Sequence, residues 1–363
     1  MLVAWRARPT AFADYVYLAD AWWHGRNWIA FPGDFLDAIP YHGRAYVIAP
    51  PLPALLLLPL VWLFGTNANQ TLLDNALGAL GVFAAWRLCE RIGLDRRTTA
   101  AATAFAFFGT SFFVCATTGA VWFLEDAAAF SFSLLALAET FGRGRAWLVA
   151  VWALCAALSR YPEFGALPAY VALGLIRRGR GAGEERFAFP LVPALVGWVL
   201  YNFNRWRSVL DEGYRYYHRA MDPASAAPAF SLAYVPMQMH ELLATGPRVI
   251  GRAPWIVPSL FGTSITFTSL PFAYAPFAGF GFEARALWFA VVATALPALC
   301  YYDSGNEQFG VRHALDFEPF LFALLLLALK RRPSLLVTRA LVAFAAVGGV
   351  GALVWLLWPD LAR

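Results

Sequence analysis

Residues 335–358 read LLVTRALVAFAAVGGVGALVWLLW and carry one charged side chain, that of Arg339. A run of this length and polarity matches the roughly 20 apolar residues that an α-helix needs to cross the ~30 Å hydrocarbon core of a bilayer. The sequence therefore predicts a membrane-spanning helix at this position.

The whole chain has the composition of a membrane protein. Of its 363 residues, 60% are apolar and 14% are charged, and the mean hydropathy is +0.56, whereas soluble domains carry about 25% charged residues. The net charge of +5 could indicate a nucleic-acid-binding protein. The arginines, however, lie in short clusters between apolar runs, which is typical of membrane topology signals. We therefore expect a lipid environment and no nucleic-acid partner.

Cysteine and histidine usage gives no sign of a metal centre. Cys89, Cys115, Cys155 and Cys300 lie at scattered positions in or beside apolar runs, and no CxxC motif or ligand-spaced histidine pair is present. We expect neither a disulfide nor a metal, and no cofactor.

Apolar segments of suitable length recur along the chain and predict about ten spans. These are Leu72–Leu88, Thr98–Cys115, Val121–Phe141, Ala146–Leu158, Phe164–Ile176, Phe187–Phe203, Ser259–Phe280, Ala286–Tyr301, Ala314–Leu329 and Leu335–Trp358. Residues 146–176 are divided into two helices because Arg160 and Glu163 lie at the midpoint, and charges at the bilayer centre are costly. The predicted fold is all-α, a polytopic transmembrane helical bundle.

Arginine placement predicts the orientation of the bundle. Clusters of arginine and lysine occupy alternate loops, at 87–97, 143–145, 177–186 and 330–332. The positive-inside rule assigns these loops to the cytoplasm. Residues 1–70 then form an extracytoplasmic first loop, and residues 71–363 form the bundle with an extracytoplasmic loop at 204–258. The predicted location is a bacterial inner membrane, with the active face outside.

The proline-rich run at 49–64, APPLPALLLLPLVWLF, is apolar but short. The alternation of arginines is kept if this run is a helix lying flat in the membrane interface. The chain then begins outside, so we expect a further span upstream of this sequence, unless the number of spans differs by one. The aromatic-rich loop at 204–258 is expected to form interfacial helices that roof a cavity.

The first loop holds the first set of candidate functional residues. It contains the acids Asp14, Asp20, Asp34 and Asp37 together with His24, Arg26, His42 and Arg44, among many tyrosines and tryptophans. One carboxylate could act as a general base and one arginine could hold a phosphate. The alternative is a solvated loop with an aromatic belt.

Two further candidates open a predicted span. Glu125 and Asp126 follow an external turn, and acids inside spans are functional by default because they are costly to bury. Their directions differ by about 100° on a helix, so we do not expect them to share a proton. The alternative is that both stabilise the helix N-terminus. Arg160, in the stretch LSRYPEF, is a lone cation whose alternative role is an ion pair with Glu163.

The turn at 301–319, YYDSGNEQFGVRHALDFEP, holds the last set. Gly305 and Gly310 permit a tight backbone there. Arg312, followed by His313, is well placed for a lipid phosphate at the membrane surface. The alternative is an Arg312–Asp316 pair, four residues apart on one helical face.

The order of these features resembles the GT-C superfamily of membrane glycosyltransferases, in particular the branch of protein O-mannosyltransferases and bacterial aminoarabinose transferases. The matching segments run through nearly the whole chain. They are YVYLADAWWHGR at 15–26, GRAYVIAPPLPALLLLPLVWLFG at 43–65, LEDAAAFSFSLLALAE at 124–139, ALSRYPEF at 157–164 and QFGVRHALDFEPFLFALLLL at 308–327.

The resemblance implies that the first external loop carries the catalytic acid and that an arginine near a late span meets the lipid phosphate. The family's acidic pair stands four and three residues before the tyrosine of a Tyr-x-x-x-Ala element. Aligned on Tyr15, these positions hold Ala11 and Phe12. Asp14 or Asp37 is therefore expected to be the base.

The implied activity is transfer of a sugar from a polyprenyl-phosphate donor to an extracytoplasmic acceptor that the sequence does not identify. Arg312, Arg160 and Arg44 are the candidates for stabilising the phosphate, without a metal. The alternatives are a transporter or lipid flippase, or a non-catalytic relative of the family. A transporter would place charges along a path at the midplane, whereas the charges here gather at one face, which favours an enzyme.

Overall fold

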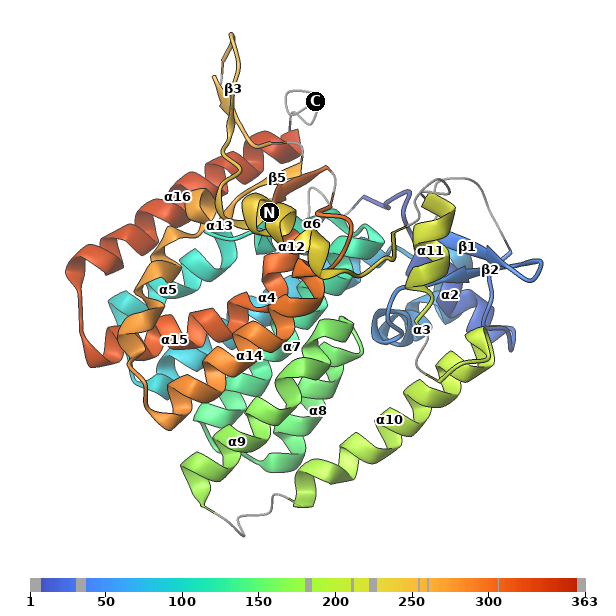
Figure 1. Cartoon of the computed structure of the whole chain (residues 1–363), viewed down its shortest axis with the longest axis horizontal. Helices are drawn as coiled ribbons and strands as arrows, with labels where there is room; N and C mark the ends of the chain where they lie inside the picture. The colour runs from blue at the N-terminus through green and yellow to red at the C-terminus, as the bar shows by residue number, and fades with distance from the viewer. Residues whose placement is uncertain are drawn as a thin grey trace.

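The computed structural model of the chain describes residues 8–30, 37–179, 185–209, 212–221, 227–253, 255–259, 261–305 and 307–357. These residues form mainly helices, with three short two-stranded sheets in the connecting segments. The helical class predicted from the sequence is confirmed (Figure 1).

Five helices of the described residues are long and apolar enough to cross a membrane. They are α4 (Gln70–Ile92), α7 (Val121–Phe141), α10 (Glu185–Trp206), α14 (Phe282–Leu299) and α16 (Leu335–Leu357). A sixth candidate consists of α5 (Arg96–Phe108) and α6 (Phe112–Thr118), which are bent by 57° at the break between them. Five or six candidate spans are thus found in these ranges, where about ten were expected.

The difference lies in the shorter apolar segments. Three of the expected spans are the helices α8 (Ala146–Ala157), α9 (Leu167–Arg178) and α15 (Glu318–Arg331), each shorter than a full crossing requires. The expected break between α8 and α9 is confirmed, and the 3-10 helix η2 (Tyr161–Ala166) fills it.

The predicted span Ser259–Phe280 is wrong. Its described residues form the strand β5 (Phe261–Thr263), the short helix α13 (Ile265–Thr268) and the 3-10 helix η4 (Leu270–Ala278). Pro271 and Pro276 lack the N–H groups that a continuous α-helix needs. The hydroxyl of Thr268 donates to the backbone carbonyl of Ser264 at 3.2 Å, a local bond of the kind that often bends helices.

The first seventy residues fold against the bundle as α2 (Asp14–Trp23), β1 (Ala38–Tyr41), β2 (Arg44–Val47), α3 (Leu52–Phe64) and η1 (Gly65–Asn67). The hairpin β1–β2 turns through His42 and Gly43, both with positive φ, as a two-residue turn of the type that matches strand twist. The proline-rich run is helical, as predicted, and α3 leaves Trp62 and Leu63 exposed. Its orientation in the membrane stays a prediction.

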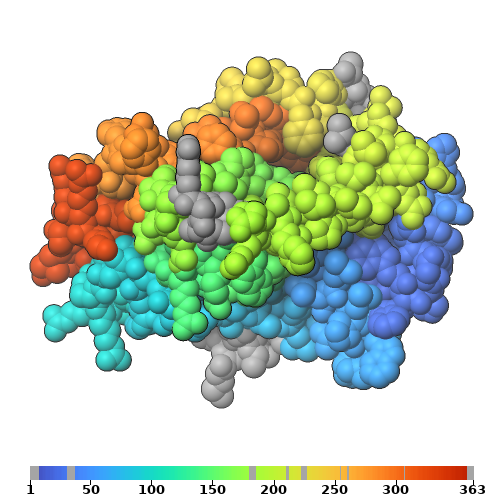
Figure 2. Space-filling model, turned by 90° about the horizontal axis from the view of Figure 1, so that it is seen from below, coloured from blue at the N-terminus to red at the C-terminus, as the bar shows by residue number. Residues whose placement is uncertain are grey.

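The segment 204–258, predicted to be an extracytoplasmic loop, contains α11 (Tyr214–Met221), η3 (Leu232–Tyr234), α12 (Val235–Leu243) and the hairpin of β3 (Arg248–Val249) and β4 (Ile256–Val257). The strand β6 (Gln308–Gly310) pairs in parallel with β5, and η5 (Arg312–Asp316) follows it. Two views agree that the N-terminal elements lie at one end of the molecule and α16 at the other (Figures 1 and 2).

Helix α7 is the centre of the bundle, since 89% of its most apolar 18-residue stretch is buried inside the structure, against 11% for the corresponding stretch of α10. Small residues on α4 allow this close packing. A Cβ atom on Gly81 would lie 2.5 Å from both Phe112 Cζ and Ser131 Oγ. The acids near the start of α7 are therefore surrounded by other elements of the fold rather than by lipid.

We expect the Gly81→Leu substitution to destabilise the protein, because the added side chain cannot enter the contact between α4, α6 and α7 without overpacking. Overpacking of this kind costs about 1–3 kcal/mol, measurable as a lower Tm in detergent. The control is Gly197→Leu on α10, where a Cβ meets nothing within 4 Å. Equal Tm values for the two variants would contradict this packing.

Candidate functional site

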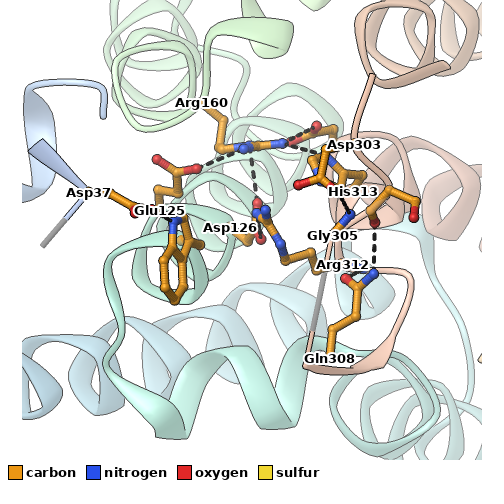
Figure 3. A network of polar contacts seen from close by, with 12 residues as sticks. Asp37, Glu125, Asp126, Arg160, Asp303, Gly305, Gln308, Arg312 and His313 are labelled. Atoms are coloured by element: carbon orange, nitrogen blue, oxygen red, sulfur yellow. Dashed lines mark hydrogen bonds and ion pairs between the residues drawn. The ribbon is translucent and has the colours of Figure 1, made fainter. Parts of the chain in front are cut away.

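Arg160 occupies the break between α8 and η2, where its extended backbone directs the side chain into the bundle. Its Nη1 donates to Glu125 at 2.7 Å, and its Nε and Nη2 donate to the two oxygens of Asp316 at 3.0 and 2.8 Å. The Nε also lies 3.1 Å from Asp126 Oδ1. One buried guanidinium thus holds three carboxylates together (Figure 3).

This arrangement answers the alternatives left open by the sequence. Arg160 does not pair with Glu163, whose carboxylate accepts a hydrogen bond from Ser133 at 2.9 Å. Glu125 and Asp126 point into the bundle rather than simply completing a helix terminus, because both meet the same guanidinium. Buried charges of this kind are tolerated only when they are paired and hydrogen-bonded.

Arg312 lies at the start of η5 and reaches the same cluster from the other side. Its Nη1 donates to Asp126 Oδ2 at 3.3 Å, and its backbone N–H donates to Gln308 Oε1 at 3.1 Å. The alternative for Arg312, a pair with Asp316, is not formed, because Asp316 faces Arg160. Within the described residues, the bond to Asp126 is the one bond of the Arg312 guanidinium, and the Arg312 side chain is 12% exposed. Most of its donors are therefore available to a ligand.

His313 contacts Arg160 through Nδ1, at 3.3 Å from Nη2. A guanidinium can only donate, so Nδ1 accepts and Nε2 carries the proton. Burial, together with the positive charges of Arg312 and Arg160, holds the pKa of His313 well below its usual range, so the ring is neutral. Its Nε2 has no hydrogen-bond partner among the residues that the structure describes.

Asp14 and Asp37 meet at the edge of this cluster. Asp14, in the first turn of α2, is fully buried, and its Oδ1 accepts the backbone N–H of Asp37 at 2.9 Å. Burial, followed by the charge of Asp37, raises the pKa of Asp14 to about 7. Asp14 thus holds the backbone that carries Asp37, while Asp37 itself stays partly exposed.

The Asp37 carboxylate accepts hydrogen bonds from Trp122 Nε1 and, at 3.4 Å, from the Tyr217 hydroxyl. Burial raises its pKa above the ordinary aspartate value, and these two bonds and the charge of Arg312 oppose that effect. The carboxylate of Asp37 is therefore more basic than that of a solvated aspartate, and it lies within the field of Arg312.

Helix α7 joins the Arg160 cluster to the pair formed by Asp14 and Asp37. Trp122, which contacts Asp37, is on the same helix as Glu125, and the Tyr15 hydroxyl donates to Glu125 Oε2 at 3.3 Å. Two bonded groups connected through α7 form this network, which contains all but one of the residues expected from the sequence, namely Asp14, Asp37, Glu125, Asp126, Arg160, Arg312 and His313.

Arg44 is the exception. It lies exposed on β2, with its guanidinium 5.2 Å from the centre of the Trp28 ring. Asp34 of the first loop falls outside the described residues.

Sequence reasoning did not single out Trp122 or Tyr217. Trp122 could have been found, because it stands three residues before Glu125 and so on the same face of a helix. Tyr217 is one of several tyrosines in α11, and no pattern distinguishes it.

The first turn of α4 fixes the geometry between the first loop and α7. Gln70 Nε2 donates to the carbonyls of Phe12 at 2.9 Å and Gly119 at 2.5 Å. Asp74 Oδ2 accepts the Gly119 N–H at 2.8 Å. Gly119 has a φ of +74°, which favours glycine, and it forms the turn between α6 and α7. These bonds hold the segment before Asp14 beside the start of α7.

Within the described ranges, no group of three or more histidine, cysteine, aspartate or glutamate side chains is arranged to hold a metal ion.

No family model matches the chain, and no curated protein does. Among solved structures, it is similar to the Archaeoglobus fulgidus oligosaccharyltransferase tethered with an acceptor peptide containing the NVT sequon, at 14% identity and a TM-score of 0.46 over 97% of this chain. The apo form of that protein gives 14% identity and a TM-score of 0.45 over 94% of this chain.

The chain spans about half the length of these structures, 52% and 50%. Both TM-scores are below 0.5.

We expect Asp14→Asn to stabilise the protein at neutral and alkaline pH. With its pKa raised from 3.8 to about 7, folded Asp14 binds a proton that the unfolded chain has released, so stability falls as the pH rises between these values. Asparagine keeps the acceptor for the Asp37 N–H without the charge. At about pH 8, the Tm of the variant should exceed that of the native protein by several degrees. Between about pH 5 and pH 8, the Tm of the variant should fall less than the Tm of the native protein.

The matched control for this effect is Asp20→Asn on the same helix, whose side chain is 25% exposed. Its Tm should follow the native pH dependence. If the Tm of Asp14→Asn had the same pH dependence as the Tm of the native protein, Asp14 would not be the buried group that lowers stability as the pH rises.

Proposed function

We propose that this protein is a membrane glycosyltransferase that moves a sugar from a polyprenyl-phosphate donor to an acceptor on the extracytoplasmic side of a bacterial inner membrane. The observation that supports this most is that Asp37 lies within electrostatic range of Arg312, which comes from the other end of the chain and is bonded to Asp126 of the Arg160 cluster. A base and a cation with free donors are the two groups that such a transfer needs.

Asp37 is the better candidate for the base. Of the two acids expected from the sequence, Asp14 is fully buried and bonded to the backbone, whereas Asp37 is partly exposed. Its raised pKa makes it a stronger proton acceptor, and pKa values nearer to neutral suit general bases. Asp14 then acts as a positioning residue that sets the direction of Asp37.

Arg312 is the better candidate for the phosphate. All three guanidinium nitrogens of Arg160 face carboxylates, so Arg160 has little capacity left for a ligand. Among the described residues, the Arg312 guanidinium bonds only to Asp126, and the side chain is partly exposed. Because Asp126 is shared by both arginines, Arg160 fixes the carboxylate that in turn orients Arg312.

The reaction follows from these positions. Asp37 takes the proton of the acceptor O–H as the oxygen attacks the anomeric carbon, and the bond from that carbon to the phosphate oxygen breaks. The polyprenyl phosphate leaves as an anion, and its charge is stabilised by Arg312. Direct displacement inverts the configuration at the anomeric carbon. No cofactor takes part in this scheme.

We expect Asp37→Asn to lower the transfer rate by about 10²–10⁴-fold, the contribution of a general base. The measurement is release of polyprenyl phosphate from a panel of polyprenyl-phosphate hexoses and pentoses in vesicles. Asp20→Asn, in the same first segment but outside the network, should keep native activity. Full activity of Asp37→Asn would exclude Asp37 as the base.

We expect Arg312→Gln to lower kcat by about 10²-fold or more, as the loss of one donor to developing negative charge does in other enzymes. Arg312→Lys should recover part of this loss, because a lysine keeps the charge without the fork of donors. Arg44→Gln, which removes an exposed guanidinium of the first loop, is the control. A loss for Arg44→Gln equal to that for Arg312→Gln would contradict the assignment.

A further inference from the structure

A groove lies at the far end of α7 from the candidate site. It is bordered by the end of α7 and the adjoining turn, the start of α8, the end of α9 and the start of α10, and it is a shallow, partly open depression with a cavity volume of about 30 Å³. Thr140 lines it on α7, fifteen residues after Glu125, which corresponds to about 22 Å along a helix. The groove is therefore separate from the Arg160 cluster.

The interior of the groove is apolar and its mouth is cationic. Val149, Tyr170 and Phe187 are buried residues of its wall, and Arg177 and Arg178 border it. Such a combination fits an amphiphile whose charged group is anionic and whose remainder is apolar.

Glycines provide the space. A Cβ atom on Gly174 of α9 would meet nothing within 4 Å, so this helix face is open toward the groove. At Gly144, which has a φ of +57°, a Cβ would lie 2.4 Å from Arg178 Nε. The Arg178 guanidinium thus lies directly against the backbone at the mouth.

The two arginines differ in their bonding. Arg177 donates to Glu283 at 2.5 Å and lies 4.6 Å from the centre of the Phe141 ring. Arg178 makes no hydrogen bond or ion pair with any residue of the described part of the chain. An unpaired guanidinium above an apolar groove is complementary to a phosphate group that carries an acyl chain.

The position of the groove identifies the source of such a phosphate. Arg143, Arg145, Arg177 and Arg178 all lie at this end of the helices, in the loops that the positive-inside rule assigns to the cytoplasm. The cytoplasmic leaflet contains anionic lipids, and basic pockets between helices on that side bind their head groups.

We propose that this groove is a binding site for an anionic phospholipid of the cytoplasmic leaflet. Arg178 holds the phosphate, Arg177 supports it, and the first acyl carbons lie over the partly exposed lining residues Ala146, Val171 and Gly174. The proposal is independent of glycosyl transfer, since it concerns the other end of the bundle.

The test is lipid binding to the purified full chain in detergent, measured by native mass spectrometry after delipidation and addition of phosphatidylglycerol or phosphatidylcholine. We expect phosphatidylglycerol to bind at least fivefold more tightly than phosphatidylcholine. Arg178→Gln should weaken phosphatidylglycerol binding by about fivefold, the effect of one arginine near an anionic lipid surface. Arg97 is an exposed arginine of the same face outside the groove, and the Arg97→Gln control should bind phosphatidylglycerol as tightly as the native protein does.

A second variant tests the apolar part of the site. The Gly174→Leu substitution fills the open helix face, and its Cβ atom meets no other atom within 4 Å, so the variant should fold. It should bind phosphatidylglycerol about tenfold or more weakly, as expected when a ligand pocket is filled.

Several outcomes would overturn the proposal. Equal binding of the two lipids, or unchanged phosphatidylglycerol binding in both Arg178→Gln and Gly174→Leu, would show that the groove holds no specific lipid. Displacement of phosphatidylglycerol by inorganic phosphate at equal concentration would show an anion site without a lipid component.

Discussion

The buried guanidinium of Arg160 is the interaction on which the candidate site depends. It draws Glu125 and Asp126 of α7 and Asp316 of η5 to one point from separate parts of the chain. Three carboxylates this close would repel one another and would be costly to bury without a shared cation. The cluster therefore fixes the distance between the start of α7 and the segment that carries Arg312, since neither can move away without leaving a buried charge unpaired.

This constraint separates the residues by role. The groups nearest to Arg160 are saturated by one another and have little capacity for a substrate. The groups at the edge, Asp37 and Arg312, are held by single contacts to the cluster or its helix and remain partly exposed. The proposed base and the proposed phosphate-binding cation are thus placed on a rigid support, which is how precise sites are usually built. The groove at the other end of α7 has the reverse arrangement, with an apolar interior and cations at the mouth.

Much of the fold could be predicted from the apolar pattern, and part of it could not. The spans at α4, α7, α10, α14 and α16 follow from long apolar runs, because a bilayer requires a fixed length of helix. The run at 259–280 has the same composition but contains Pro271 and Pro276, and hydropathy does not weigh the missing N–H groups that prevent a helix there. The bend between α5 and α6 is similarly invisible to composition.

For the site, the sequence alone determined which residues had to be explained. Charged side chains in an apolar chain are costly, so Glu125, Asp126, Arg160 and Arg312 stood out without any knowledge of the fold. Only the tertiary structure decided their partners: it joined Arg160 to Asp316 and Arg312 to Asp126, where nearby residues in the chain had been the alternatives. The reason is physical, since pairing in a folded bundle depends on which helix ends meet in space, and the spacing of residues along the chain does not contain that information.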